Sequence, residues 1–72
     1  MTKIEYMQLF VEMTRNEDTQ TSIANLLGIS QQAVSRKLSG KNQWRINEIE
    51  KLCKYYNKDF CELFKREETQ NN

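Results

Sequence analysis

Residues 20–41 read QTSIANLLGISQQAVSRKLSGK, and the fold depends on this stretch. A hydroxyl at Thr19 precedes it in the position of a helix N-cap, and apolar residues follow at the spacing of one helix face. These apolar residues are Ile23, Ala24 and Leu27. Gly28 then stands where a positive φ ends a helix at little cost. We therefore predict a helix over residues 20–27.

A second helix is predicted directly after this glycine. Ser30 supplies its N-cap, and a small apolar face recurs at helical spacing through Ala33, Val34 and Leu38. The helix extends over 31–39 before Gly40 ends it. Because only a few residues separate the two helices, they must cross at a steep angle. The combination is a helix-turn-helix signature.

The remainder of the chain also has helical spacing, and strand alternation is nowhere sustained. Three further helices are predicted over residues of about 3–15, 46–56 and 59–65. Asp59 is positioned to cap the last of them. We expect one all-α domain, a compact five-helix arrangement in residues 1–66 around the central helix-turn-helix, followed by a polar C-terminal tail over 67–72.

The 72-residue chain has a formal charge of only +1, but its charges are unevenly distributed. Residues 19–47 contain four bases and no acid, whereas the segments on either side are net negative. The bases are Arg36, Lys37, Lys41 and Arg45. This segment is therefore locally positive, and a positive segment of this kind attracts nucleic acid.

Several other function classes find no support in the composition. The chain has no histidine, no glycine-rich phosphate cradle and no serine or cysteine with a base nearby, so we expect neither an enzyme nor a cofactor. Cys53 and Cys61 are interpreted as reduced, half-buried thiols, and no metal site is expected. No signal peptide and no apolar run of about 20 residues is visible, which favours a cytoplasmic protein without a membrane or small-molecule partner.

The outward face of the 31–39 helix carries side chains suited to reading base edges. At about 100° per residue, four of them fall in one arc opposite the apolar residues: Gln31, Gln32, Ser35 and Arg36. Gln can bond the N6 and N7 edge of adenine, Arg the O6 and N7 edge of guanine, and Ser either. We predict that these four contact bases. The alternatives are an ordinary solvated face and, for Ser35, a hydrogen bond to its own preceding turn.

A resemblance to a known family covers residues 19–41, which read TQTSIANLLGISQQAVSRKLSGK. This stretch resembles the helix-turn-helix of the Cro and phage-repressor family, also called the XRE family. The resemblance extends over roughly residues 4–64 and implies that the 31–39 helix is the recognition helix, expected in the major groove of DNA. The whole chain is similar to the small Cro-like and modulator-of-repression proteins of temperate phages. Lys37 departs from the family pattern, which often has an apolar residue there. We interpret it as a rim residue whose ammonium reaches outward.

Phosphate contacts are predicted at the start of the 20–27 helix and in the loop after Gly40. Gln20 matches a family position that commonly touches the DNA backbone, and the free N–H groups at a helix start suit an anion. The loop after Gly40 supplies the other candidates, which are Lys41, Asn42, Gln43 and Arg45. The alternative for Lys41 and Arg45 is ordinary loop solubility.

Apolar residues in the last third of the chain indicate either a core or a protein interface. Trp44 is interpreted as a core or interface anchor in preference to a base-stacking residue. The fifth helix is unusually apolar, and it either closes the core or leaves a patch that meets another subunit. The candidate interface residues are Trp44, Phe60, Leu63 and Phe64.

These observations and the resemblance lead to three functional hypotheses. The first is a sequence-specific double-stranded DNA-binding regulator of a phage or prophage lysis-lysogeny switch, a Cro-like repressor acting as a homodimer on its operator. The second is a modulator or anti-repressor that acts in a hetero-complex with a companion phage repressor. An antitoxin is less favoured, because no long toxin-wrapping tail is expected after the domain.

Overall fold

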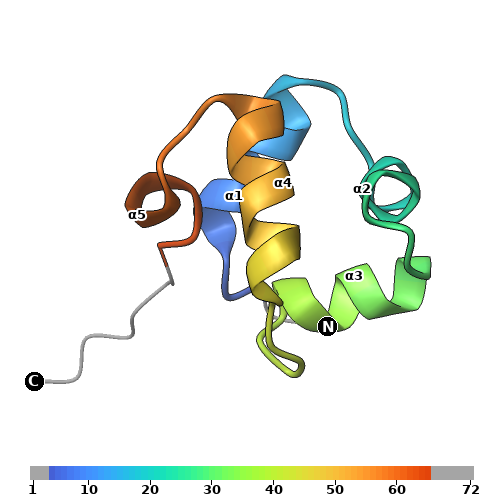
Figure 1. The fold of residues 1–72 in the computed structure, drawn as a ribbon. Coiled ribbons are helices and arrows are strands. Elements are labelled where there is room, and N and C mark those ends of the chain that lie inside the picture. The colour runs from blue at the N-terminus through green and yellow to red at the C-terminus, as the bar shows by residue number, and fades with distance from the viewer. Residues whose placement is uncertain (1–3, 66–72) are drawn as a thin grey trace, which may run out of the picture.

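A computed structural model describes residues 4–65, which form five α-helices and no strand (Figure 1). The helices are α1 (Met7–Arg15), α2 (Gln20–Leu27), α3 (Gln31–Leu38), α4 (Ile46–Tyr56) and α5 (Phe60–Leu63). The predicted all-α class is confirmed, whereas the predicted tail over 67–72 lies outside the described residues. None of these five helices has the length and apolar content needed to cross a membrane.

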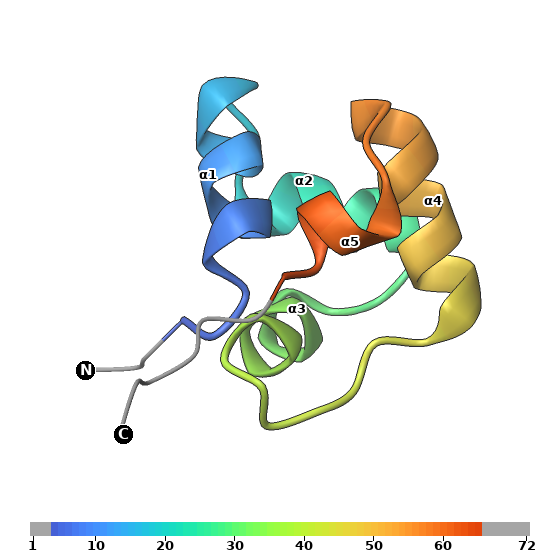
Figure 2. The same ribbon diagram turned by 90° about the vertical axis from the view of Figure 1, so that its left-hand side faces the viewer.

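One core lies at the centre of the described chain and receives side chains from every helix. Figure 1 shows α4 upright in the middle, with α2 and α3 on one side and α5 on the other. In Figure 2, α5 lies between α1 and α4, and α3 runs beneath them. The buried apolar side chains are Leu9, Met13, Ile23, Ala24, Leu27, Val34, Leu38, Leu52, Tyr56, Leu63 and Phe64. Each helix therefore has one buried side, as the apolar spacing predicts.

The predicted turn between α2 and α3 is confirmed by its cap geometry. Thr19 Oγ1 accepts the backbone N–H of Ser22 at 3.1 Å, and Ser22 Oγ accepts that of Thr19 at 3.1 Å. Gly28 has φ 72°, the left-handed conformation that ends α2. Ser30 Oγ accepts the N–H of Ala33 at 3.1 Å and begins α3. Each side-chain cap contributes about 1 kcal/mol, so the limits of both helices are set locally.

The first helix is shorter than the predicted 3–15, because it begins only at Met7. The segment before it is not helical and lies against α3. There the N–H groups of Glu5 and Tyr6 both donate to the Leu38 carbonyl, at 2.8 and 3.2 Å. This contact satisfies a carbonyl at the end of α3 that has no partner within the helix. Residue 3 itself lies outside the described residues.

The last helix is also shorter than predicted, at Phe60–Leu63 in place of 59–65. Asp59 holds the N-cap position as expected, but its side chain makes no capping hydrogen bond. Burial of Leu63 in the core holds this single turn, since so short a helix is not stable by itself. Of the other predicted ranges, α2 and α4 match, and α3 ends one residue early with Ser39 as its C-cap.

Candidate nucleic-acid interface

Burial fixes the orientation of α3. Val34 is fully buried and Leu38 is 1% exposed, and both belong to the core that α2 covers. Ile29, in the turn between the two helices, packs against the same core. Because α2 and α3 pack closely against each other, the buried side sets the rotation of α3 about its axis. The opposite side faces solvent.

The predicted base-reading side chains lie on that solvent side. Gln31, Gln32 and Arg36 are exposed, and Ser35 is half-buried. Within residues 4–65 the Ser35 hydroxyl has no hydrogen-bond partner, so it is not bonded back to its own helix. Ser39, by contrast, donates its hydroxyl to the Arg36 carbonyl at 3.0 Å. The face thus presents amides, a hydroxyl and a guanidinium, and their contact with bases stays a prediction.

The fold brings one acid to the edge of this face, which the sequence reasoning missed. The carboxylate of Glu5 lies against Gly40, so closely that a Cβ on Gly40 would overlap it. Gly40 has φ 86° and follows the C-cap of α3. Residues 19–47 are free of acids, but the surface that they form is not, because the N-terminal segment supplies a carboxylate at the C-terminal end of α3.

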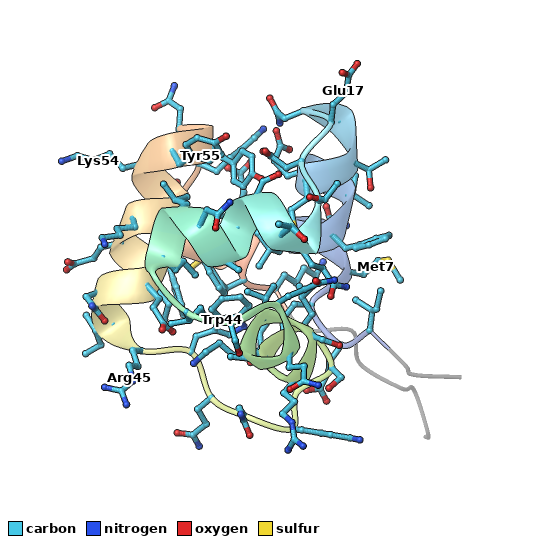
Figure 3. The ribbon with its side chains drawn as sticks, turned by 90° about the vertical axis from the view of Figure 1, so that its right-hand side faces the viewer. Met7, Glu17, Trp44, Arg45, Lys54 and Tyr55 are labelled. Atoms are coloured by element: carbon cyan, nitrogen blue, oxygen red, sulfur yellow. The ribbon has the colours of Figure 1, made fainter. Side chains whose placement is uncertain are left out.

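The loop after α3 folds back on the last turn of that helix. The N–H groups of Lys41 and Asn42 donate to the Arg36 carbonyl at 2.9 and 3.2 Å. The predicted phosphate contacts of this loop, Lys41, Asn42, Gln43 and Arg45, are all exposed. Figure 3 shows Arg45 pointing away from the body of the protein, whereas the neighbouring Trp44 lies within it. The structure therefore places these candidates directly beside α3, the predicted recognition helix.

Gln20 lies on the other helix of the motif. It is the first residue of α2 and is half-buried. N–H groups in the first turn of a helix have no intrahelical partner, and the helix dipole favours an anion there. The position is compatible with a phosphate contact, which stays a prediction.

Lys37 is not the rim residue that the sequence suggests, and that interpretation is wrong. Its side chain is buried, and its Nζ lies 3.0 Å from Glu48 Oε1 and donates to the Gln43 carbonyl at 3.0 Å. The ammonium also lies 5.8 Å from the centre of the Trp44 ring. Glu48 is equally buried, and its Oε1 accepts the Arg45 N–H at 3.0 Å. The ammonium can turn inward because α4 supplies a buried carboxylate that pairs with it.

The candidate interface residues divide between core and surface. Leu63 and Phe64 are 2% and 6% exposed, so they close the core, whereas Phe60 is 56% exposed and Trp44 is half-buried. Trp44 meets Phe64 edge-on with ring centres 5.4 Å apart, and Phe60 stacks on Phe64 at 5.8 Å. A surface hollow of about 280 Å³ is lined by Tyr6, Gln43, Trp44, Ile49, Phe60 and Phe64. Among the candidate interface residues, the accessible apolar surface lies at this aromatic hollow beside the loop and does not cover the whole of α5.

The two cysteines are free thiols in different surroundings. Cys53 is half-buried, as predicted, but Cys61 is exposed. Burial, together with the nearby charge of Asp59, raises the pKa of the Cys53 thiol. In the described part of the chain, no three His, Cys, Asp or Glu side chains come together as a candidate metal site.

Two short helices joined by a glycine turn, with a polar outer face beside a basic loop, define a small helix-turn-helix domain. The chain belongs to the BetR domain family, whose model matches residues 6–72. No curated protein and no solved structure matches the chain. The family supports a DNA-binding regulatory role. It does not specify the Cro and phage-repressor (XRE) family, so that finer assignment stays a proposal.

Proposed function

We propose that the protein is a sequence-specific double-stranded DNA-binding transcriptional regulator of the Cro-like kind, in a phage or prophage lysis-lysogeny switch. It acts by binding, without catalysis or a cofactor, in the cytoplasm of the bacterial host. One observation carries the proposal: the buried side of α3 holds its amide and guanidinium face toward solvent, beside the exposed basic loop 41–45. An orientation set by burial is what base readout requires.

In the proposed complex, α3 lies in the major groove. Gln31 and Gln32 bond the adenine edge, and Arg36 bonds the guanine edge. Lys41 and Arg45 neutralise phosphates, which gives affinity without sequence information. Two copies place two such helices about 34 Å apart on a partly palindromic operator. Occupation of the operator then excludes polymerase or a competing repressor.

A titration of the intergenic DNA beside the protein's own gene, followed by gel shift at several salt concentrations, tests this proposal. Arg36→Ala is expected to weaken operator binding by about 1–3 kcal/mol and to relax the preference at one base position. Arg15→Ala is the matched control, because it removes one exposed guanidinium from α1. Equal operator affinity of the two variants would show that Arg36 does not read a base.

The aromatic hollow supports a second candidate function, a modulator or anti-repressor that binds a companion phage repressor. Phe60 is largely exposed, and the buried Nε1 of Trp44 has no hydrogen-bond partner among residues 4–65. Accessible aromatic rings are enriched at protein contact surfaces. This function needs no DNA contact from α3.

The two candidates are separated by adding the purified companion repressor to the same gel shift. If the chain binds DNA alone and the companion changes nothing, the regulator is supported. If the chain instead removes or alters the companion's own shift, and Phe60→Ser abolishes that effect, the complex is supported. Phe60 is exposed enough for this substitution to leave the fold intact.

A further inference from the structure

The proposed DNA contacts come from two segments, a helix and a loop, that have to keep a fixed spacing. The loop spans residues 39–45 between α3 and α4 and has no regular structure. Its start is held to α3 by the Arg36 carbonyl. Its middle and its end need another attachment, since ordering each loop residue costs backbone entropy.

Lys37 supplies that attachment from the inner side of the recognition helix. Its Nζ donates to the Gln43 carbonyl at 3.0 Å, which fixes the middle of the loop. The same ammonium pairs with Glu48 Oε1 at 3.0 Å, and this oxygen accepts the Arg45 N–H at 3.0 Å, which fixes the end. One buried cation therefore connects α3 to both residues that flank Trp44.

This network is not explained by stability alone. A buried ion pair is often no more stabilising than apolar side chains of the same volume, because both charges lose their hydration. Its hydrogen bonds are directional, however. The loop can take few conformations in which one ammonium bonds both a carbonyl and a carboxylate. Trp44 also holds the loop, but its ring packs on Tyr6 and Phe64, and it meets α3 through the Lys37 ammonium itself.

We propose that Lys37 is a positioning residue for DNA binding. It never touches DNA, and it keeps Lys41 and Arg45 at the spacing from the base-reading face that lets phosphates and base edges be contacted together. The inference rests on the proposed DNA-binding function. In this inference Lys37 positions the loop bases that contact phosphates, whereas Gln31, Gln32 and Arg36 determine sequence preference.

The test replaces the pair by neutral side chains of similar size, Lys37→Met with Glu48→Gln. The formal charge is unchanged, no buried charge is left alone, and the new amide oxygen can still accept the Arg45 N–H. The matched control is Lys51→Met with Glu50→Gln, the same two changes on exposed positions of α4. Operator affinity is measured from low to high salt for the wild type and both variants.

The paired variant is expected to reduce the slope of log affinity against log salt by about one to two, one for each phosphate contact that is lost. Its discrimination between the operator and an operator with one changed base should stay as in the wild type. The control variant should keep both the slope and the discrimination. A slope equal to that of the wild type would overturn the inference.

A second measurement combines these changes with Lys41→Ala and Arg45→Ala. Loss of the two loop bases should reduce the salt slope in the wild type but have little further effect in the paired variant. Equal losses in both backgrounds would overturn the inference, because the loop bases would then contact phosphate without Lys37. Loss of helical circular dichroism in the paired variant would overturn it too, because the pair would then hold the fold and not the loop.

The inference and the proposed function fail in distinguishable ways. If the wild type shows no salt-dependent preference for its operator, the proposed function is wrong, and the inference with it. If the wild type binds the operator and the paired variant retains the full salt slope, only the inference about Lys37 is wrong.

Discussion

The hydroxyl of Tyr56 donates a 2.8 Å hydrogen bond to Oδ2 of Asp18, a residue 38 positions earlier in the chain. Tyr55 donates to Oδ1 of the same carboxylate at 3.3 Å. These bonds join the connection between α1 and α2 to the end of α4 that lies away from the loop 41–45. They close the domain opposite the candidate interface, so their removal should change stability and leave DNA binding intact.

Tyr56→Phe is expected to lower the free energy of unfolding by about 1–2 kcal/mol, because a part-buried hydrogen bond to a charged group is lost. Tyr55→Phe is the matched control, since its ring is about half exposed and its bond is longer. It should cost clearly less than Tyr56→Phe, because substitutions at exposed positions usually change stability little. Urea unfolding of both variants measures the difference, and equal losses would contradict the assignment.

The free energy of unfolding should fall at alkaline pH because Tyr56 ionises there. Burial, and then the hydrogen bond to Asp18, raise the pKa of Tyr56 above its ordinary value of 10.0. The folded protein therefore holds the phenolic proton more tightly than the unfolded chain does. Its stabilising contribution is fully present below about pH 10 and is lost as the pH rises further.

Thermal unfolding between pH 8 and pH 11 checks this expectation, with Tyr56→Phe as the control. The wild type should lose stability more steeply above about pH 10 than the variant, which has no phenol at this position. Parallel curves for the two proteins would show that ionisation of Tyr56 is not linked to unfolding.

Gly28→Ala should destabilise the turn between α2 and α3 by about 1–2 kcal/mol through backbone conformation alone. Gly28 has φ 72°, and no atom lies near the place where a Cβ would stand. Gly28→Asn should cost less, because asparagine tolerates the left-handed region. If Gly28→Asn is as destabilising as Gly28→Ala in chemical denaturation, backbone strain is not the cause.

Phe64 lies in the core and Phe60 on the surface, so replacing each by alanine should lower the free energy of unfolding by different amounts. Phe64→Ala should cost about 3–5 kcal/mol, since the ring is 6% exposed and packs on Trp44 and Phe60. Phe60→Ala should cost less than about 1 kcal/mol, since its ring is 56% exposed. Calorimetric melting of the two variants gives the comparison, and a larger loss for Phe60 would reverse the assignment.

Local features of the fold could be predicted from the sequence. The limits of α2 depend on the Thr19 cap and on Gly28, and the start of α3 depends on Ser30, so each is determined within a few residues. The exposed face of α3 follows from the apolar spacing of Val34 and Leu38 in the same way. These predictions needed no knowledge of the rest of the chain.

Contacts between distant segments could not be predicted in this way. The start of α1 depends on the Leu38 carbonyl, and the direction of the Lys37 side chain depends on Glu48. One signal was nevertheless present. Glu48 follows Arg45 at the spacing of the carboxylate in a capping box, which indicates that this acid faces the loop. The arginine side chain has no acceptor to complete the box, so only the Glu48 half forms.

The two hydrogen bonds from Glu5 and Tyr6 to the Leu38 carbonyl also matter for the handling of the protein. They fasten the start of the described chain to the last turn of α3 (Figure 2). In the proposed complex, an affinity tag at the N-terminal end would therefore be joined to the chain within a few residues of this contact, close to where DNA is expected to bind. Tagged protein and protein from which the tag has been cleaved should be compared before any weak operator affinity is attributed to the native surface.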